Sequence, residues 1–146
     1  MGVALPDILK DLHQTCASLG CILFTVSRLD PPKGVVWRSY TSHPVEYPLQ
    51  GTKPLERDAW YDSCITGKQT FVANTPAEFE KVFFDHALIT SMGLGSAANI
   101  PVADDSGQVI ATVNLLAESG HFTVERLHAY ESLVTAARPA LVAALV

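Results

Sequence analysis

The chain has 146 residues, of which 48% are hydrophobic and 17% charged, and its formal net charge is −5. This composition is typical of one globular domain over residues 1–146 and excludes an intrinsically disordered chain. The charge is acidic and no basic patch is present, so we expect no nucleic-acid partner. No apolar run is long enough to cross a bilayer, so we expect no membrane partner either.

Charged residues also interrupt the N-terminal stretch, because Asp7, Lys10 and Asp11 stand where a signal peptide would carry its apolar region. The three cysteines are an odd number without metal-type spacing, which is typical of a reducing compartment. We therefore expect a cytoplasmic protein with no disulfide, no metal and no other cofactor.

Apolar residues recur at helical spacing at both ends of the chain. They predict a first helix over residues 6–19, with Gly20 at its end. Thr123 can cap a last helix, inside which Pro139 should cause a kink. That helix carries more apolar side chains near its end than one sheet face needs, which predicts an interface. The surplus residues are Leu141, Val142, Leu145 and Val146.

The middle of the chain alternates short strands with short helices. A helix is expected over residues 56–66, and another from Pro76 towards Met92, broken near Asp85. Period-two alternation predicts strands over residues 21–29, 35–42 and 69–73 and a hairpin over residues 96–117, with an irregular segment or short edge strand between residues 44 and 54. Because the strands come mainly as hairpins, the class is α+β with an antiparallel sheet.

This order of elements, together with four local sequences, resembles the GAF domain over nearly the whole chain. The matching sequences are Trp60 with the segment CITGKQTFV at residues 64–72, the segment LGSAANIPV at residues 94–102, the strand at residues 107–116, and His121-Phe122-Thr123 before a helix. The resemblance implies a central antiparallel sheet of about five to six strands. It also implies terminal helices on one face, shorter helices and loops over a small-molecule pocket on the other, and homodimers through the terminal helices.

The better-known GAF subfamily signatures are mostly missing. The set of asparagine, lysine, phenylalanine, aspartate and glutamate that marks cyclic-nucleotide GAF domains cannot be assembled from this sequence. Cys64 and Asp85-His86 are only superficially similar to the cysteine and aspartate–histidine pattern of bilin-binding types. Compact single-domain bacterial GAF proteins are the most similar group, and that resemblance implies no particular ligand.

Asn99 and Asn114 each stand in an otherwise aliphatic strand of the expected hairpin. A buried amide must be hydrogen-bonded or it destabilises the fold. Two interpretations follow: an internal pair that fixes the strand register, or two side chains that line a pocket. Thr112 would share the face of Asn114, whereas neighbouring Ala111 and Val113 would face the terminal helices.

Asp85 and His86 stand where the middle helix breaks. They could bind a polar ligand, or Asp85 could be the N-cap of a second short helix with His86 exposed. Arg38 and Tyr40 are expected on one face of their strand, where Arg38 could pair with an anionic ligand or simply be exposed. The candidate ligand-binding residues are Arg38, Tyr40, Trp60, Tyr61, Asp85, Ile89, Ser96, Asn99, Thr112 and Asn114.

The cysteines open an alternative, because free methionine-(R)-sulfoxide reductases are GAF proteins that use cysteines for attack and resolution. Cys16 falls on the apolar stripe of the first helix, Cys21 at the start of a strand and Cys64 within a helix. Such positions are typical of buried cysteines that pack as small hydrophobic residues. We therefore predict a small-molecule-binding sensor without catalytic residues, with a reductase and a purely structural dimerisation module as alternatives.

Overall fold

The computed structural model describes residues 4–49 and 51–145. Six strands form one antiparallel sheet in the order β3-β2-β1-β6-β5-β4. The strands are β1 Leu23–Asp30, β2 Val35–Thr41, β3 Lys53–Pro54, β4 Phe71–Ala73, β5 Ser96–Ala103 and β6 Val109–Ala117. The predicted α+β class, the two hairpins and the short edge strand are confirmed.

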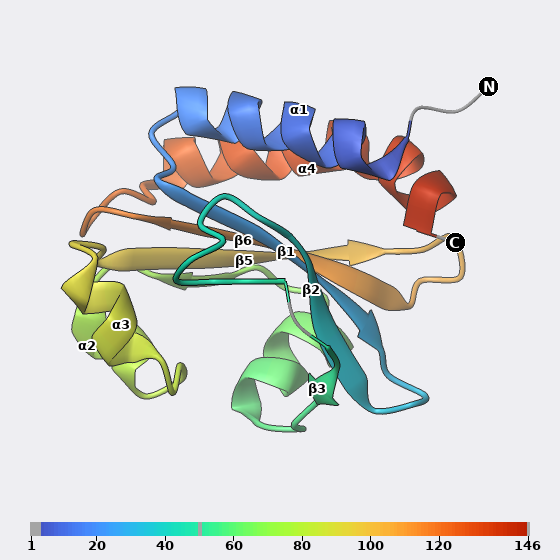
Figure 1. The fold of residues 1–146 in the computed structure, drawn as a ribbon, viewed down its shortest axis with the longest axis horizontal. Coiled ribbons are helices and arrows are strands. Elements are labelled where there is room, and N and C mark those ends of the chain that lie inside the picture. The colour runs from blue at the N-terminus through green and yellow to red at the C-terminus, as the bar shows by residue number, and fades with distance from the viewer. Residues whose placement is uncertain (1–3, 50, 146) are drawn as a thin grey trace.

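Two long helices, α1 (Leu5–Ser18) and α4 (Val124–Leu145), lie side by side across one face of the sheet (Figure 1). Aliphatic residues of β6 that alternate along the strand, Ala111, Val113 and Leu115, face these helices in the largest core cluster. Thr123 caps α4 as expected, because its hydroxyl accepts from the backbone N–H of Arg126 at 3.2 Å. No helix within residues 4–49 and 51–145 is long and apolar enough to cross a membrane.

Three short helices lie beneath the other face (Figure 1): η1, a π-helix at Tyr61–Thr66, α2 (Pro76–Glu80) and α3 (His86–Ser91). The break near Asp85 is confirmed. The helix expected over residues 56–66 starts only at residue 59, and residues 59–60 lead directly into η1. It starts late because the Leu55 N–H still bonds the carbonyl of Gly34 and the carboxylate of Asp58 caps the Tyr61 N–H. It ends as expected at Gly67, where a Cβ would lie 2.7 Å from the Ser63 carbonyl oxygen.

The surplus of apolar residues at the end of α4 is not an exposed stripe. Leu141, Val142 and Leu145 are at most 8% exposed in the single chain, where they pack into the core cluster beneath α1 and α4. The sequence-based reason for an interface was therefore wrong for these three residues. Val146 lies outside the described residues.

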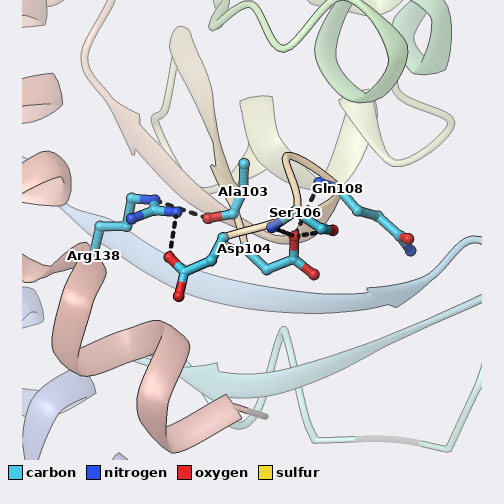
Figure 2. Close-up of polar contacts among 6 residues, drawn as sticks. Ala103, Asp104, Ser106, Gln108 and Arg138 are labelled. Atoms are coloured by element: carbon cyan, nitrogen blue, oxygen red, sulfur yellow. Dashed lines mark hydrogen bonds and ion pairs between the residues drawn. The ribbon is translucent and has the colours of Figure 1, made fainter.

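A polar turn joins β5 to β6 and is tied to α4 (Figure 2). The Asp104 carboxylate accepts from the N–H and hydroxyl of Ser106 and from the N–H of Gln108. Arg138 donates to the Ala103 carbonyl at 2.8 Å and forms an ion pair with Asp105. These contacts fix the hairpin that carries Asn99 and Asn114 against the helical layer.

Leu141→Ala should lower the free energy of unfolding by about 2–5 kcal/mol, because it opens a cavity in a closed core. Urea unfolding measures this loss, and the half-buried Leu133→Ala on the same helix is the control with the smaller effect. Sedimentation of native Leu141→Ala should match the wild type. Weaker association at unchanged stability would instead place Leu141 in an interface.

Asp104 should make the hairpin turn sensitive to acid. The Ser106 hydroxyl, followed by backbone N–H groups, lowers the pKa of Asp104 below its ordinary 3.8. A carboxylate with a depressed folded-state pKa stabilises the fold above the unfolded-state pKa, and this contribution disappears as the pH falls through the folded-state pKa. The stability difference between wild type and Asp104→Asn in urea should therefore shrink from pH about 6 to pH about 3. A difference that stays constant over this range would contradict the assignment.

Candidate functional site

The sheet face away from α1 and α4 carries two rows of polar side chains at its centre. In one row Asn99 on β5, Asn114 on β6 and Thr25 on β1 are successive cross-strand partners. In the next row Thr112 on β6 is opposite Ser27 on β1. Side chains two residues apart on a strand point to the same face, so these five side chains converge on one surface.

The side chains of the first row form a chain of hydrogen bonds with a fixed direction. The indole Nε1–H of Trp60 can only donate, and it lies 2.9 Å from Asn99 Oδ1. Asn99 Nδ2 then donates to Asn114 Oδ1 at 3.0 Å. Asn114 Nδ2 donates to Thr25 Oγ1 at 3.1 Å and to Ser27 Oγ at 3.0 Å. The tryptophan therefore sets the orientation of both amides.

Two apolar clusters flank this polar surface, and through them the short helices pack against the sheet. One cluster lies under α2 and α3 and contains Leu23, Leu116, Phe79 and Ile89. The other lies under η1 and contains Leu29, Tyr61, Cys64, Ile65 and Val109. One apolar patch is covered by η1 and the other by α2 and α3 together, so the polar rows between the patches are left as the floor of a cavity.

The cavity has a volume of about 770 Å³, within the range of small-molecule sites. Its floor is polar and its walls are mostly apolar. Its lining comprises Leu23, Thr25, Ser27, Val36, Arg38, Glu46, Tyr47, Pro48, Lys53, Pro54, Leu55, Glu56, Asp58, Trp60, Val82, Phe83, Phe84, Asp85, Leu88, Ile89, Asn99, Thr112, Asn114 and Leu116.

Tyr47 connects the loop after β2 to α3. Its hydroxyl donates to the Asp85 carboxylate at 2.5 Å, and the Arg38 guanidinium lies over its ring, 5.0 Å from the centroid. Burial, followed by the contact with Asp85, raises the pKa of Tyr47, so the phenol keeps its proton for this bond. Burial lowers the pKa of Arg38, while Tyr47 and Asp85 oppose that change.

Seven of the ten candidate residues line the cavity. They are Arg38, Trp60, Asp85, Ile89, Asn99, Thr112 and Asn114. Asp85 holds the N-cap position of α3, but its side chain bonds Tyr47 instead of capping the helix, and His86 is half-buried, not exposed. For Asn99 and Asn114 both interpretations apply, since they bond each other and also line the cavity.

Tyr40, Ser96 and Tyr61 do not line the cavity. A bulge in β2 places Ser27 opposite Arg38 but Val26 opposite Tyr40, so Arg38 faces the cavity and Tyr40 faces the helical layer. The expectation that Arg38 and Tyr40 share a face was therefore wrong. Tyr40 instead contacts His13 of α1, its hydroxyl 2.7 Å from the His13 Nδ1.

The other two residues fail for simpler reasons. Ser96 has the strand parity of Ala98, which faces the helices, and its hydroxyl donates to the Glu118 carbonyl. Tyr61 is packed in the cluster under η1, with Arg57 over its ring.

Thr25, Ser27 and Tyr47 line the cavity but were not expected there from the sequence. Side chains alternate between the two faces of a strand, so Thr25 and Ser27 point away from the face that carries Phe24 and Val26. Their face could therefore have been predicted from the period of two. Tyr47 lies in an irregular loop, where no sequence pattern indicates the direction of a side chain.

All three cysteines are free and buried, as expected. Burial raises the thiol pKa of Cys16, Cys21 and Cys64 to about 12. The thiolate is the nucleophile in cysteine chemistry, so these thiols are poorly activated. Cys64 is a residue of η1, is 0% exposed and lies outside the cavity lining. Within the described residues no group of three His, Cys, Asp or Glu side chains could hold a metal ion.

Comparison with solved structures identifies the fold. The GAF domain of a two-component sensor histidine kinase from Bacillus halodurans aligns over 97% of this chain and 93% of its own, with a TM-score of 0.74 and 14% identity. A GAF domain/HD domain protein from Geobacter sulfurreducens aligns over 92% and 90%, with a TM-score of 0.73 and 14% identity. A type II free methionine-R-sulfoxide reductase from Thermoplasma acidophilum covers 93% and 92%, with a TM-score of 0.64 and 11% identity.

The chain therefore has the GAF fold, as its sequence predicted. No family model matches the sequence, and no curated protein matches it.

Asn114→Leu should lower the free energy of unfolding by about 1–3 kcal/mol, because it removes three hydrogen bonds and leaves the Asn99 amide without its acceptor. Thr112→Val is the matched control on the same strand and face, since Thr112 is outside the hydrogen-bonded chain, and it should cost less than about 1 kcal/mol. Urea unfolding of both variants measures the difference. Equal costs would show that the chain of amides contributes no stability of its own.

Proposed function

We propose that this GAF-fold protein is a regulatory module that binds a small molecule in the cavity beneath β1, β5 and β6. The observation that carries the proposal is the buried polar floor of that cavity. Thr25, Asn99 and Thr112 are each at most 5% exposed, yet they line an open space of about 770 Å³. Buried polar groups are costly, so a face that served only for packing would favour aliphatic residues.

The opposite face of the same strands is apolar, as expected of a face that serves only for packing. The residues that alternate with Asn99, Thr112 and Asn114 along β5 and β6 face α1 and α4, and all of them are aliphatic. Hydrogen bonding within the polar rows offsets much of their desolvation cost without filling the cavity. A pocket with apolar walls and a few convergent polar groups is the usual composition of a ligand site.

The cover of the cavity is suited to respond to a ligand. The bond between Tyr47 and Asp85 joins the loop after β2 to the start of α3, and both residues line the cavity. Segments with few buried contacts open more easily than a core. A ligand against Tyr47 or Asp85 would change the position of this cover, and a partner or a second copy of the chain could read that change. Dimerisation through α1 and α4 and a cytoplasmic location stay predictions from sequence.

We propose binding rather than catalysis. Sensor-kinase domains and sulfoxide reductases are both similar in fold to this chain. The raised pKa of each cysteine and the position of Cys64 outside the cavity lining favour a non-catalytic module. Reduction of free methionine-(R)-sulfoxide by the wild type, lost when all three cysteines are replaced by alanine, would instead support the reductase.

Protein purified from cells should carry or capture a small molecule in this cavity. Native mass spectrometry measures any retained mass, and Trp60 reports on the same space once Trp37, the other tryptophan, is replaced by phenylalanine. We expect the retained mass to be lost in Asn114→Leu. It should remain in Thr135→Leu, which changes the exposed side of α4. A mass retained equally by folded Asn114→Leu would place the ligand outside this cavity.

A further inference from the structure

The β1–β2 side of the cavity floor brings hydrogen-bond donors together. The bulge in β2 makes Arg38 the cross-strand partner of Ser27, and Thr25 lies two residues away from Ser27 on the same face. All three residues line the cavity. An arginine and two hydroxyl-bearing residues therefore occupy neighbouring strand positions on one face.

Both hydroxyls at this place are left with a proton to donate. Thr25 Oγ1 and Ser27 Oγ each accept from Asn114 Nδ2, and no described residue accepts from either hydroxyl. This direction follows from Trp60, which can only donate and so orients both amides towards β1. Because Thr25 and Ser27 accept from Asn114, their hydroxyls are left as hydrogen-bond donors at this end of the cavity.

Arg38 adds further donors and a charge. Its Nη1 donates to the Pro48 carbonyl at 2.7 Å, and no other described residue accepts from the guanidinium. Arginine keeps its charge at physiological pH and presents a planar fork that matches a carboxylate. A ligand that displaces water from these donors must supply acceptor atoms, or the buried donors lose their partners.

The rest of the lining limits the charge and the body of that ligand. Four carboxylates, from Glu46, Glu56, Asp58 and Asp85, line the cavity, but Lys53 is the one other lining cation besides Arg38 among the described residues. This excess of carboxylates disfavours a dianion such as a phosphate monoester more strongly than a monoanion. The walls on either side are apolar, with Val36, Leu55 and Trp60 on one side and Leu23, Ile89 and Leu116 on the other.

We infer that the cavity takes a monocarboxylate with an apolar body, whose carboxylate lies against Arg38, Ser27 and Thr25. The inference rests on the proposed function, because it requires that the cavity binds a small molecule. The apolar body would lie between the two wall clusters, and Trp60 would contact it.

The test uses matched pairs of probes that differ in charge and keep the same skeleton. Phenylacetate and hexanoate are compared with phenylacetamide and hexanamide, and phenyl phosphate is the dianion. Binding is followed by Trp60 fluorescence in the full chain with Trp37→Phe. We expect each carboxylate to bind at least about tenfold more tightly than its amide, since a charge-assisted pair is lost in the amide.

Variants locate the charge that is responsible. Arg38→Gln should remove most of the preference for carboxylate over amide, and Ser27→Ala should reduce it. Arg28→Gln is the matched control, because Arg28 is on β1 but donates to the Leu145 carbonyl on the helical side of the sheet. It should leave the preference unchanged.

The inference would be overturned by amides that bind as tightly as carboxylates, by a preference that survives in Arg38→Gln, or by tighter binding of phenyl phosphate than of phenylacetate. Failure of every probe to bind at millimolar concentration would also overturn it. None of these results would remove the proposed function, which depends on whether the mass retained by purified protein is lost in Asn114→Leu.

Discussion

The hydrogen bond from the Trp60 indole to Asn99 is the interaction on which the character of the cavity depends. An asparagine side chain can present either its oxygen or its nitrogen to a neighbour, but an indole N–H accepts nothing. Asn99 must therefore turn its oxygen towards Trp60 and its nitrogen towards Asn114. The same constraint passes through Asn114 to the hydroxyls on β1. One donor on a short covering helix thus sets the polarity of a surface formed by three strands.

The polar surface stays open because the helices cover the two faces of the sheet differently. Helices α1 and α4 cover one face with mainly apolar contacts. On the other face, η1 sits on one apolar cluster and α2 and α3 on another. Because no continuous layer of helix covers the centre of this face, the polar rows line a cavity instead of a packed core. The cost of burying Asn99 is offset by its hydrogen bonds to Trp60 and Asn114, and Thr112 faces the cavity.

The features of the fold that depend on local periodicity could be predicted from the sequence. The terminal helices, the hairpin of β5 and β6 and the polar face of that hairpin follow from spacings of three to four or of two residues. The face of the sheet to which Tyr40 points could not be predicted. One extra residue in the β2 bulge reverses the alternation of side chains, and no residue type in the sequence indicates the bulge. The start of the helix at residue 59 instead of residue 56 depends on the hydrogen bond between Leu55 and Gly34, which are far apart in sequence. The role of Tyr47 depends likewise on its tertiary contact with Asp85.

Exchange of the two indole N–H protons with deuterium, followed by NMR, is the most direct test of the fixed direction of the amide chain. Trp60 donates to a nearly buried amide oxygen, whereas Trp37 is half-buried on β2 and no described residue accepts from its indole. We expect the Trp60 indole proton to exchange much more slowly than that of Trp37, and we expect Asn99→Ala to remove the protection while the sheet amides stay protected. Exchange of the Trp60 indole as fast as that of Trp37 in the wild type would contradict the fixed direction of the amide chain, and with it the assignment of donors on the cavity floor.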